Sequence, residues 1–302
     1  MSPESEILTK LYGEIKLSLT ARTDLSIPEQ RAILERLHEA ASEPIDVIYE
    51  NCTCPGTTRP AIWCKPLSAE PSTVILYLHG GAGYAGSPSS HRKLAGHLAK
   101  AARAHALVLD YRLVPEHPFP AALDDISLAY QWLLDTKYKP SQIVFAGDSA
   151  GGNFAISSVL KAKQDGKPLP AAVVTFSPWV DMEVTGQSQH FNADKDVLTP
   201  PGVGPLICQM YLAGESPKNP LANALYADFE AMPPMHISVG EWELLLSDAT
   251  RLADRAKAAG VDVVLEIASE MQHVYHFMAG SSPDADGTIL RVGKWLQDKF
   301  DH

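Results

Sequence analysis

The sequence predicts an α/β fold with a mostly parallel sheet of about eight strands that helices cover on both faces. Short apolar runs of strand-like length recur along the chain, and from the third run onward helical stretches separate them. Such alternation implies right-handed crossovers between parallel strands, with helices packed on either side. The chain has 302 residues, 45% hydrophobic and 20% charged, so it is long enough for one large core.

Two helical segments come before the first strand. Apolar residues recur at helical spacing over residues 5–20 and 28–41, and Ser26 and Pro28 are start signals for the second segment. The strand-like runs cover residues 45–49, 61–64, 74–78, 106–109, 143–146, 171–176, 236–239 and 263–267. The helical stretches between the later runs cover residues 89–104, 121–136, 150–164 and 247–259. We expect a single domain over residues 1–302.

One interval breaks this alternation. Between Ser177 and Pro234 lies a long insertion rich in Asn, Asp, Pro and Gly, with a helical piece near residues 206–212. A structureless loop of this length is uncommon in a compact α/β unit, whereas covers of active sites are often built this way. The insertion is therefore predicted to cover a site.

Composition and charge limit the kinds of binding partner and the cellular locations that we expect for this protein. The formal net charge of -11 argues against nucleic acid or an anionic membrane, because both need a basic surface, and favours a small uncharged substrate. Residues 1–10 lack the apolar core of a secretory signal and no segment reaches membrane-spanning length, so we expect a cytoplasmic protein without a membrane anchor. The four cysteines are scattered, with no histidine pair at zinc spacing, so no metal site is predicted.

A glycine-rich turn holds the candidate nucleophile. The stretch Gly147-Asp148-Ser149-Ala150-Gly151-Gly152 lies between an apolar run and a helix-like segment. A serine on so tight a turn needs neighbours without bulk, because the strained backbone passes close to the following helix. The stretch therefore predicts a nucleophile elbow with Ser149 exposed at a helix N-terminus. Such a pattern also occurs by chance, so the prediction depends on its context.

A serine hydroxyl is a poor nucleophile near neutral pH, so acyl transfer needs a base and an acid that orients the base. Of the 11 histidines, His273 and His276 follow the last strand-like run, where a loop returns over the carboxyl edge of a sheet. We favour His273 as the base because it begins that loop. His276 lies beyond two bulky residues and can pack inward.

The candidate acid lies in the turn after the run 236–239. We favour Glu243 for this role, although Glu241 is close enough to compete with it. Asp248 follows at the start of a helix, where a carboxylate stabilises the helix N-terminus through the dipole.

A third group must stabilise the oxyanion of the tetrahedral step. Preorganised backbone N–H groups do this without reorganisation during the reaction. Gly80, Gly81 and Ala82 form a bare backbone directly after a strand-like run and make up the predicted oxyanion hole together with Ala150. The N–H groups of Gly81, Ala82 and Ala150 are the expected donors.

Three blocks of sequence in this order resemble the hormone-sensitive lipase family of α/β-hydrolases. They are His79-Gly80-Gly81, the stretch DYRLVPEHPFPAALDD from Asp110 to Asp125, and Gly147-Asp148-Ser149-Ala150-Gly151. The family commonly carries a third glycine and then an aromatic residue after its His-Gly-Gly, where this chain has Ala82 and Gly83. This departure leaves a backbone donor in place but alters the predicted acyl pocket.

The resemblance implies a carboxylesterase with Ser149 as nucleophile, His273 as base and Glu243 as acid, and it requires no cofactor. It also implies a helical cap formed by about residues 1–45 and part of 180–232, and pairing of two copies through residues around 263–300. A confined apolar pocket under a cap favours esters with short to medium acyl chains. Two alternatives stay open: an amidase or lactonase with the same triad, and a non-catalytic small-molecule receptor on the same fold. Such receptors lack the base, so His273 argues against the second.

Overall fold

A single sheet of eight strands organises the part of the chain that the structure describes. The structure is a computed structural model that describes residues 2–54, 57, 59–136, 138–200 and 202–300. The strands are β1 (Val47–Thr53), β2 (Pro60–Pro66), β3 (Glu70–Leu78), β4 (Ala104–Leu109), β5 (Ile143–Asp148), β6 (Ala172–Phe176), β7 (Met235–Gly240) and β8 (Val263–Ala268). Each predicted strand is confirmed, with ends that shift by a few residues.

The strand order is β1-β2-β4-β3-β5-β6-β7-β8. β2 runs antiparallel to both of its neighbours, β1 and β4, whereas the pairs from β4 to β8 are parallel. Central strands such as β5 and β6 are buried along their whole length because helices cover both faces. This confirms the predicted mostly parallel sheet.

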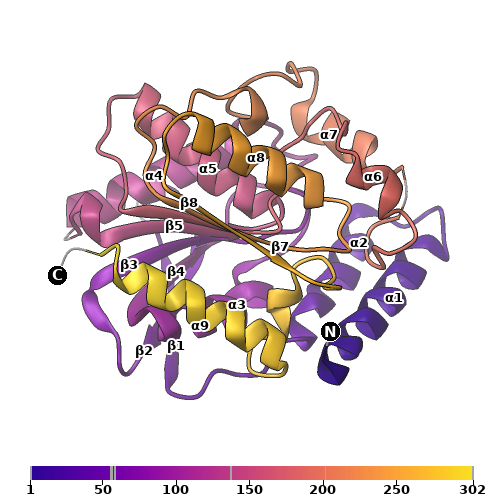
Figure 1. The fold of residues 1–302 in the computed structure, drawn as a ribbon, viewed down its shortest axis with the longest axis horizontal. Coiled ribbons are helices and arrows are strands. Elements are labelled where there is room, and N and C mark those ends of the chain that lie inside the picture. The colour runs from indigo at the N-terminus through magenta and orange to yellow at the C-terminus, as the bar shows by residue number, and fades with distance from the viewer. Residues whose placement is uncertain (1, 55–56, 58, 137, 201, 301–302) are drawn as a thin grey trace.

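The helices form a layer on each face of this sheet. On one face lie α3 (Pro88–Ala102) and α9 (Pro283–Gln297), and on the other lie α4 (Ala121–Thr136), α5 (Ala150–Gln164) and α8 (Leu246–Ala258) (Figure 1). The predicted ranges 121–136 and 150–164 match α4 and α5 at both ends. Two apolar clusters, one on either face, make the core.

The predicted helix over residues 28–41 is wrong in its second half. The α-helix α2 (Ile27–Leu34) begins with a capping box between Ser26 and Glu29, but it changes to a 3₁₀ helix over Glu35–Glu39. Side chains three apart align in the tighter winding, which fits the burial of both Leu37 and Ala40. Tertiary packing therefore overrides the α-helical periodicity there.

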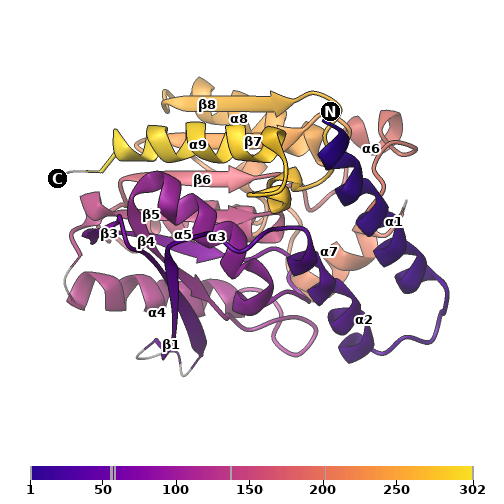
Figure 2. The same cartoon turned by 90° about the horizontal axis from the view of Figure 1, so that it is seen from below.

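The remaining helices gather at one end of the sheet. Figure 2 shows α1 (Glu6–Thr20), α2, α6 (Ser188–Phe191) and α7 (Gly204–Leu212) at the end toward which the arrows of β6 and β8 point. Loops that leave the carboxyl ends of parallel strands carry the ligand sites of such folds. None of the described helices is both long enough and apolar enough to cross a bilayer.

Candidate active site

Ser149 lies on a strained turn between β5 and α5. Its backbone has φ 53° and ψ −120°, and its N–H donates to the Phe176 carbonyl at 2.8 Å. A Cβ atom on Gly147 would lie 2.3 Å from the Gly151 oxygen, and one on Gly151 would lie 2.0 Å from the Leu78 oxygen. The two glycines are therefore required by close backbone approach, as a nucleophile elbow demands.

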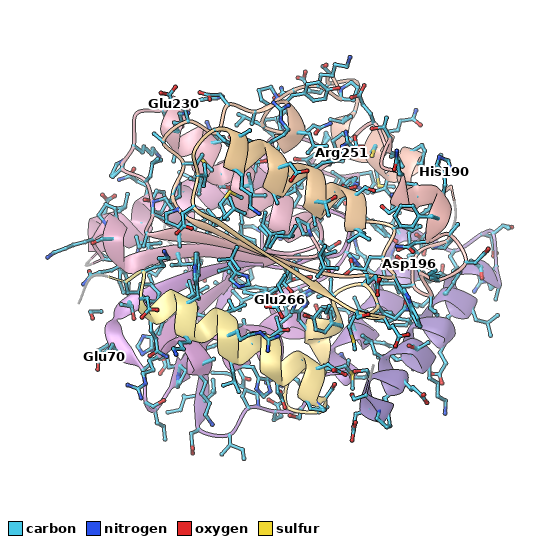
Figure 3. The ribbon with its side chains drawn as sticks, in the orientation of Figure 1. Glu70, His190, Asp196, Glu230, Arg251 and Glu266 are labelled. Atoms are coloured by element: carbon cyan, nitrogen blue, oxygen red, sulfur yellow. The ribbon has the colours of Figure 1, made fainter. Side chains whose placement is uncertain are left out.

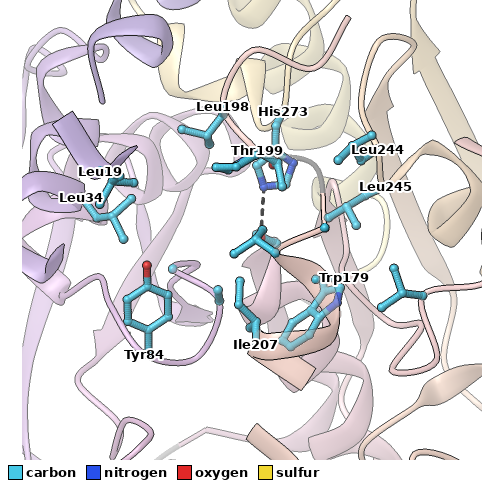
Figure 4. Close-up of a pocket in the computed structure, with 18 of the residues that line it drawn as sticks. Leu19, Leu34, Tyr84, Trp179, Leu198, Thr199, Ile207, Leu244, Leu245 and His273 are labelled. Carbon is cyan, nitrogen blue, oxygen red and sulfur yellow. Dashed lines mark hydrogen bonds between the residues drawn. The ribbon is translucent and has the colours of Figure 1, made fainter. Parts of the chain in front are cut away.

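The structure brings His273 to this serine. His273 follows β8, and its Nε2 atom lies 3.1 Å from Ser149 Oγ, the contact marked by the dashed line in Figure 4. His276, the alternative base, lies in the core: its Nε2 is 2.8 Å from Ser238 Oγ and its ring stacks on Phe176. Only His273 of this pair can exchange a proton with Ser149.

Glu243 completes the row of three side chains. Its Oε2 atom lies 2.8 Å from His273 Nδ1, and its Oε1 accepts from Ser177 Oγ at 2.6 Å and from the Gly240 N–H at 2.5 Å. Because a carboxylate only accepts hydrogen bonds, Nδ1 of His273 carries the proton and Nε2 is free to accept from the serine. The side chain of Glu243 is fully buried, so this orientation is fixed.

The two competing carboxylates are engaged elsewhere. Glu241 is half-buried, and its carboxylate accepts from Ser269 Oγ and from the Glu270 N–H. Asp248 lies in the first turn of α8, the helix start at which we expected its carboxylate. It is buried beside the segment after β6 and accepts from the N–H groups of Val180 and Asp181, both at 2.9 Å. Burial raises the pKa of Asp248 to about 7.

Burial and pairing set the protonation of the base and acid. Burial raises the pKa of Glu243, and the hydrogen bonds from His273, Ser177 and Gly240 oppose part of this effect. Burial also disfavours protonation of His273, but the hydrogen bond and charge of Glu243 outweigh it, so the pKa of His273 lies above its usual value. The imidazole is therefore a stronger proton acceptor than a free histidine.

The predicted oxyanion loop borders the same space as Ser149. Gly81 and Ala82 line the cavity, both with positive φ, and within the described residues no hydrogen-bond acceptor contacts their N–H groups. Ala150 is fully buried at the first position of α5, next to the serine. A Cβ atom on Gly81 would lie 2.2 Å from the Ala85 oxygen, so this position requires glycine.

Gly80 differs from the prediction that placed it in the oxyanion hole. Its N–H donates to His91 Nε2 at 3.2 Å, and a Cβ atom on it would lie 2.2 Å from Asp148 Oδ2. Asp148 is buried, accepts from the Tyr77 hydroxyl at 2.8 Å and lies 3.3 Å from His91. Gly80 therefore lets the loop pack on a polar cluster beneath it and has no free donor.

Sequence reasoning missed Ser177. This residue directly follows β6 and has φ 51°. It donates to Glu243 and accepts from the Val274 N–H at 3.1 Å, so it joins the acid to the loop of the base. A polar residue at the carboxyl end of a parallel strand is a sequence signal for a site residue, because ligand sites lie at this edge of such sheets. Ser177 has this position and could have been found from it.

A cavity of about 840 Å³ opens over Ser149 and His273 (Figure 4). Its lining is mostly apolar and comes from three parts of the chain. The N-terminal helices supply Leu19 and Leu34, the segment 180–212 supplies Leu198 and Ile207, and the strand exits supply Trp179 and Leu244. Such a cavity suits an apolar ligand with one reactive polar group.

Polar contacts attach the segment 180–212 to the body of the protein. Arg251 of α8 forms an ion pair with buried Asp181 at 2.6 Å, and Asp196 accepts from the Leu244 N–H at 3.0 Å. Figure 3 labels Arg251 and Asp196 at the end of the sheet that carries α6. These contacts hold the segment 180–212 next to the loop of Glu243 and to α8.

A mostly parallel sheet with a serine on the elbow after β5, and with an acid and a histidine after later strands, is the arrangement of the α/β hydrolases. A family model described as alpha/beta hydrolase fold matches residues 75–277. The chain is 36% identical over 301 residues to an acetyl-hydrolase of Streptomyces hygroscopicus. The alignment covers 98% of this chain and 97% of that protein.

Solved structures agree with these matches. An esterase of the bacterial hormone-sensitive lipase family superposes with a TM-score of 0.94 and 38% identity, over 100% of this chain and 99% of that one. The esterase EstE5, whose crystal was soaked in p-nitrophenyl butyrate, gives a TM-score of 0.90 and 36% identity over 99% of both chains. The chain therefore belongs to the α/β hydrolase family of the bacterial hormone-sensitive lipase esterases, which confirms the resemblance seen in its sequence.

Proposed function

We propose that this protein, a carboxylic ester hydrolase, cleaves small acyl esters with Ser149 as nucleophile, His273 as base and Glu243 as the acid that orients the base. One observation carries the proposal: the unbroken row in which Ser149 Oγ lies 3.1 Å from His273 Nε2 and His273 Nδ1 lies 2.8 Å from Glu243 Oε2. This row joins residues from three separate strand exits, beside a cavity that can hold an ester.

The reaction proceeds in two acyl transfers. Ser149 Oγ attacks the ester carbonyl while its proton moves to His273 Nε2, and the N–H groups of Gly81, Ala82 and Ala150 stabilise the oxyanion. The C–O bond to the alcohol breaks, and the alcohol leaves with the proton from His273. Water then attacks the acyl-serine, its proton passes through the same imidazole to Ser149, and the acid is released.

The pH dependence of turnover follows from the state of the imidazole. Only neutral His273 accepts the serine proton, so kcat/KM rises with pH as His273 loses its proton. An unperturbed histidine has a pKa of about 6.5, and Glu243 raises that of His273, so the half-maximal point lies above about pH 6.5. Initial rates with a neutral ester from pH 5 to 9 measure this point. A half-maximal pH below 6 contradicts the proposed pairing with Glu243.

The substrate proposal concerns acyl chain length. We propose short to medium acyl groups, since the apolar cavity must hold the acyl and the alcohol parts together. The similarity to an acetyl-hydrolase and to an esterase crystal soaked in a butyrate ester supports this range. We further propose that residues 1–45 and part of 180–232 act as the cap that limits the cavity.

A series of p-nitrophenyl esters from acetate to palmitate tests both the esterase activity and the length of acyl chain that the cavity can hold. Each methylene buried on binding contributes about 0.8 kcal/mol, so kcat/KM should rise up to about fourfold per methylene while space lasts, and then fall. We expect the maximum between butyrate and octanoate and at least a tenfold lower value for palmitate. A steady rise through palmitate contradicts the size limit. No hydrolysis of any ester by the folded protein supports the receptor alternative instead.

Amide or lactone cleavage, a cytoplasmic location and pairing of two copies around residues 263–300 stay predictions. The same series with a p-nitroanilide and a lactone separates esterase from amidase and lactonase activity.

A further inference from the structure

The N-terminal helix contacts the loop of the proposed base directly. Tyr12 of α1 is fully buried, and its hydroxyl donates to the main-chain carbonyl of His273 at 2.6 Å. The two residues are 261 positions apart in sequence. Leu8, Leu11 and Ile15 are buried on the same helix, so packing holds α1 in place beside this loop. Figure 2 shows α1 running across the end of the sheet where β8 stops.

The loop of His273 depends on such contacts, because its backbone is not regular. Val274 has a left-handed conformation with φ 46°, which is rare for a β-branched residue and persists only where its surroundings enforce it. Ser177 holds the Val274 N–H, and Tyr12 holds the carbonyl on the other side of the same peptide. The two hydroxyls thus fix the orientation of the peptide that follows the base.

The hydroxyl of Tyr12 is suited to this single task. Burial raises the pKa of Tyr12 well above its usual value, and the carboxylates of Glu243, Asp148 and Asp196 act in the same direction, so the hydroxyl keeps its proton and donates. The same three carboxylates are the charges that act on His273. Without the hydroxyl, the His273 carbonyl would lose its partner in a buried place, and the loop would gain freedom.

We propose that Tyr12 is a positioning residue for catalysis, whose hydrogen bond to the His273 carbonyl keeps the imidazole in line between Ser149 and Glu243. The N-terminal helix thereby contributes to the chemical step as well as to the wall of the cavity. The inference rests on the proposed role of His273 as base. It assigns Tyr12 no contact with the substrate, since Tyr12 does not line the cavity.

The test compares Tyr12→Phe with Tyr130→Phe in the full chain. Tyr130 is a matched control, because this buried tyrosine also donates its hydroxyl to a carbonyl, that of Pro168 at 2.8 Å, and neither residue lines the cavity. We expect Tyr12→Phe to lower kcat about tenfold with KM within twofold, because small misplacements of catalytic groups are costly. The acid limb of kcat/KM should move to lower pH as the bond between His273 and Glu243 weakens. Tyr130→Phe should change neither quantity.

A second control separates the hydroxyl from the packing of α1. Ser5 anchors the start of the helix through Ser282 at 2.8 Å and Asp284 at 3.0 Å, so Ser5→Ala loosens α1 without touching Tyr12. If Ser5→Ala lowers kcat as much as Tyr12→Phe does, helix packing explains the effect and the proposal is overturned. An unchanged kcat and pH limb in Tyr12→Phe overturns it too. If Tyr12→Phe is unchanged while Ser149→Ala loses turnover, the role of Tyr12 is refuted but the proposed esterase mechanism is still supported.

Discussion

Replacing Ser149 with alanine is expected to lower kcat for a p-nitrophenyl ester by about a million-fold, because the nucleophile and its base act as one unit. Residual hydrolysis about a thousandfold above the uncatalysed rate should remain, since the cavity and the N–H groups of Gly81 and Ala82 are intact. The alanine side chain removes only the hydroxyl, and the Ser149 N–H bond to Phe176 is made by the backbone. Circular dichroism and the melting temperature should therefore match those of the unaltered protein.

A matched serine and a covalent probe sharpen this test. Ser158 lies buried on α5, the helix that follows Ser149, and its hydroxyl has no hydrogen-bond partner within the described residues. Ser158→Ala should therefore retain full activity. A serine-directed fluorophosphonate should label the unaltered protein and Ser158→Ala but leave Ser149→Ala unlabelled. Near-normal turnover by a folded Ser149→Ala variant would remove this serine from the mechanism.

The parts of the site that could be predicted from sequence are those with a local cause. Gly147 and Gly151 mark the elbow because a side chain at either position would clash with the backbone, and that demand is visible in the sequence itself. The order of the strands in the chain then placed Glu243 and His273 after later strands of the sheet. In the same way, regular periodicity predicted α4 and α5 without error at their ends.

The parts that could not be predicted depend on contacts between distant segments. Nothing near Tyr12 in the sequence shows that its hydroxyl meets a carbonyl 261 residues away. Gly80 belongs to the glycine-rich loop, but its N–H donates a hydrogen bond to His91 on the following helix, α3. This contact becomes visible only in the folded structure. The role of Ser177 could not be predicted for the same reason. Its hydroxyl contacts Glu243 in the loop after β7 and Val274 in the loop after β8, and these loops meet only in the fold.

Replacing Glu243 with glutamine is expected to lower kcat about ten-thousandfold, because a neutral amide neither fixes the proton on Nδ1 nor stabilises the imidazolium that forms during the reaction. The size and shape of the side chain are kept, so KM should change little. Glu243 raises the pKa of His273, so its neutralisation should also move the remaining acid limb to lower pH. Stopped-flow and steady-state rates at several pH values measure both effects.

Glu241→Gln is the control for this variant, because Glu241 lies two residues away and its carboxylate accepts hydrogen bonds from Ser269 Oγ and the Glu270 N–H rather than from His273. It should keep kcat and the pH limb of the unaltered protein. If Glu241→Gln were severe and Glu243→Gln mild, the orienting role would belong to Glu241, in spite of the 2.8 Å contact between Glu243 and His273. Equal and small losses in both would mean that the imidazole needs no carboxylate, and the buried position of Glu243 would then be structural.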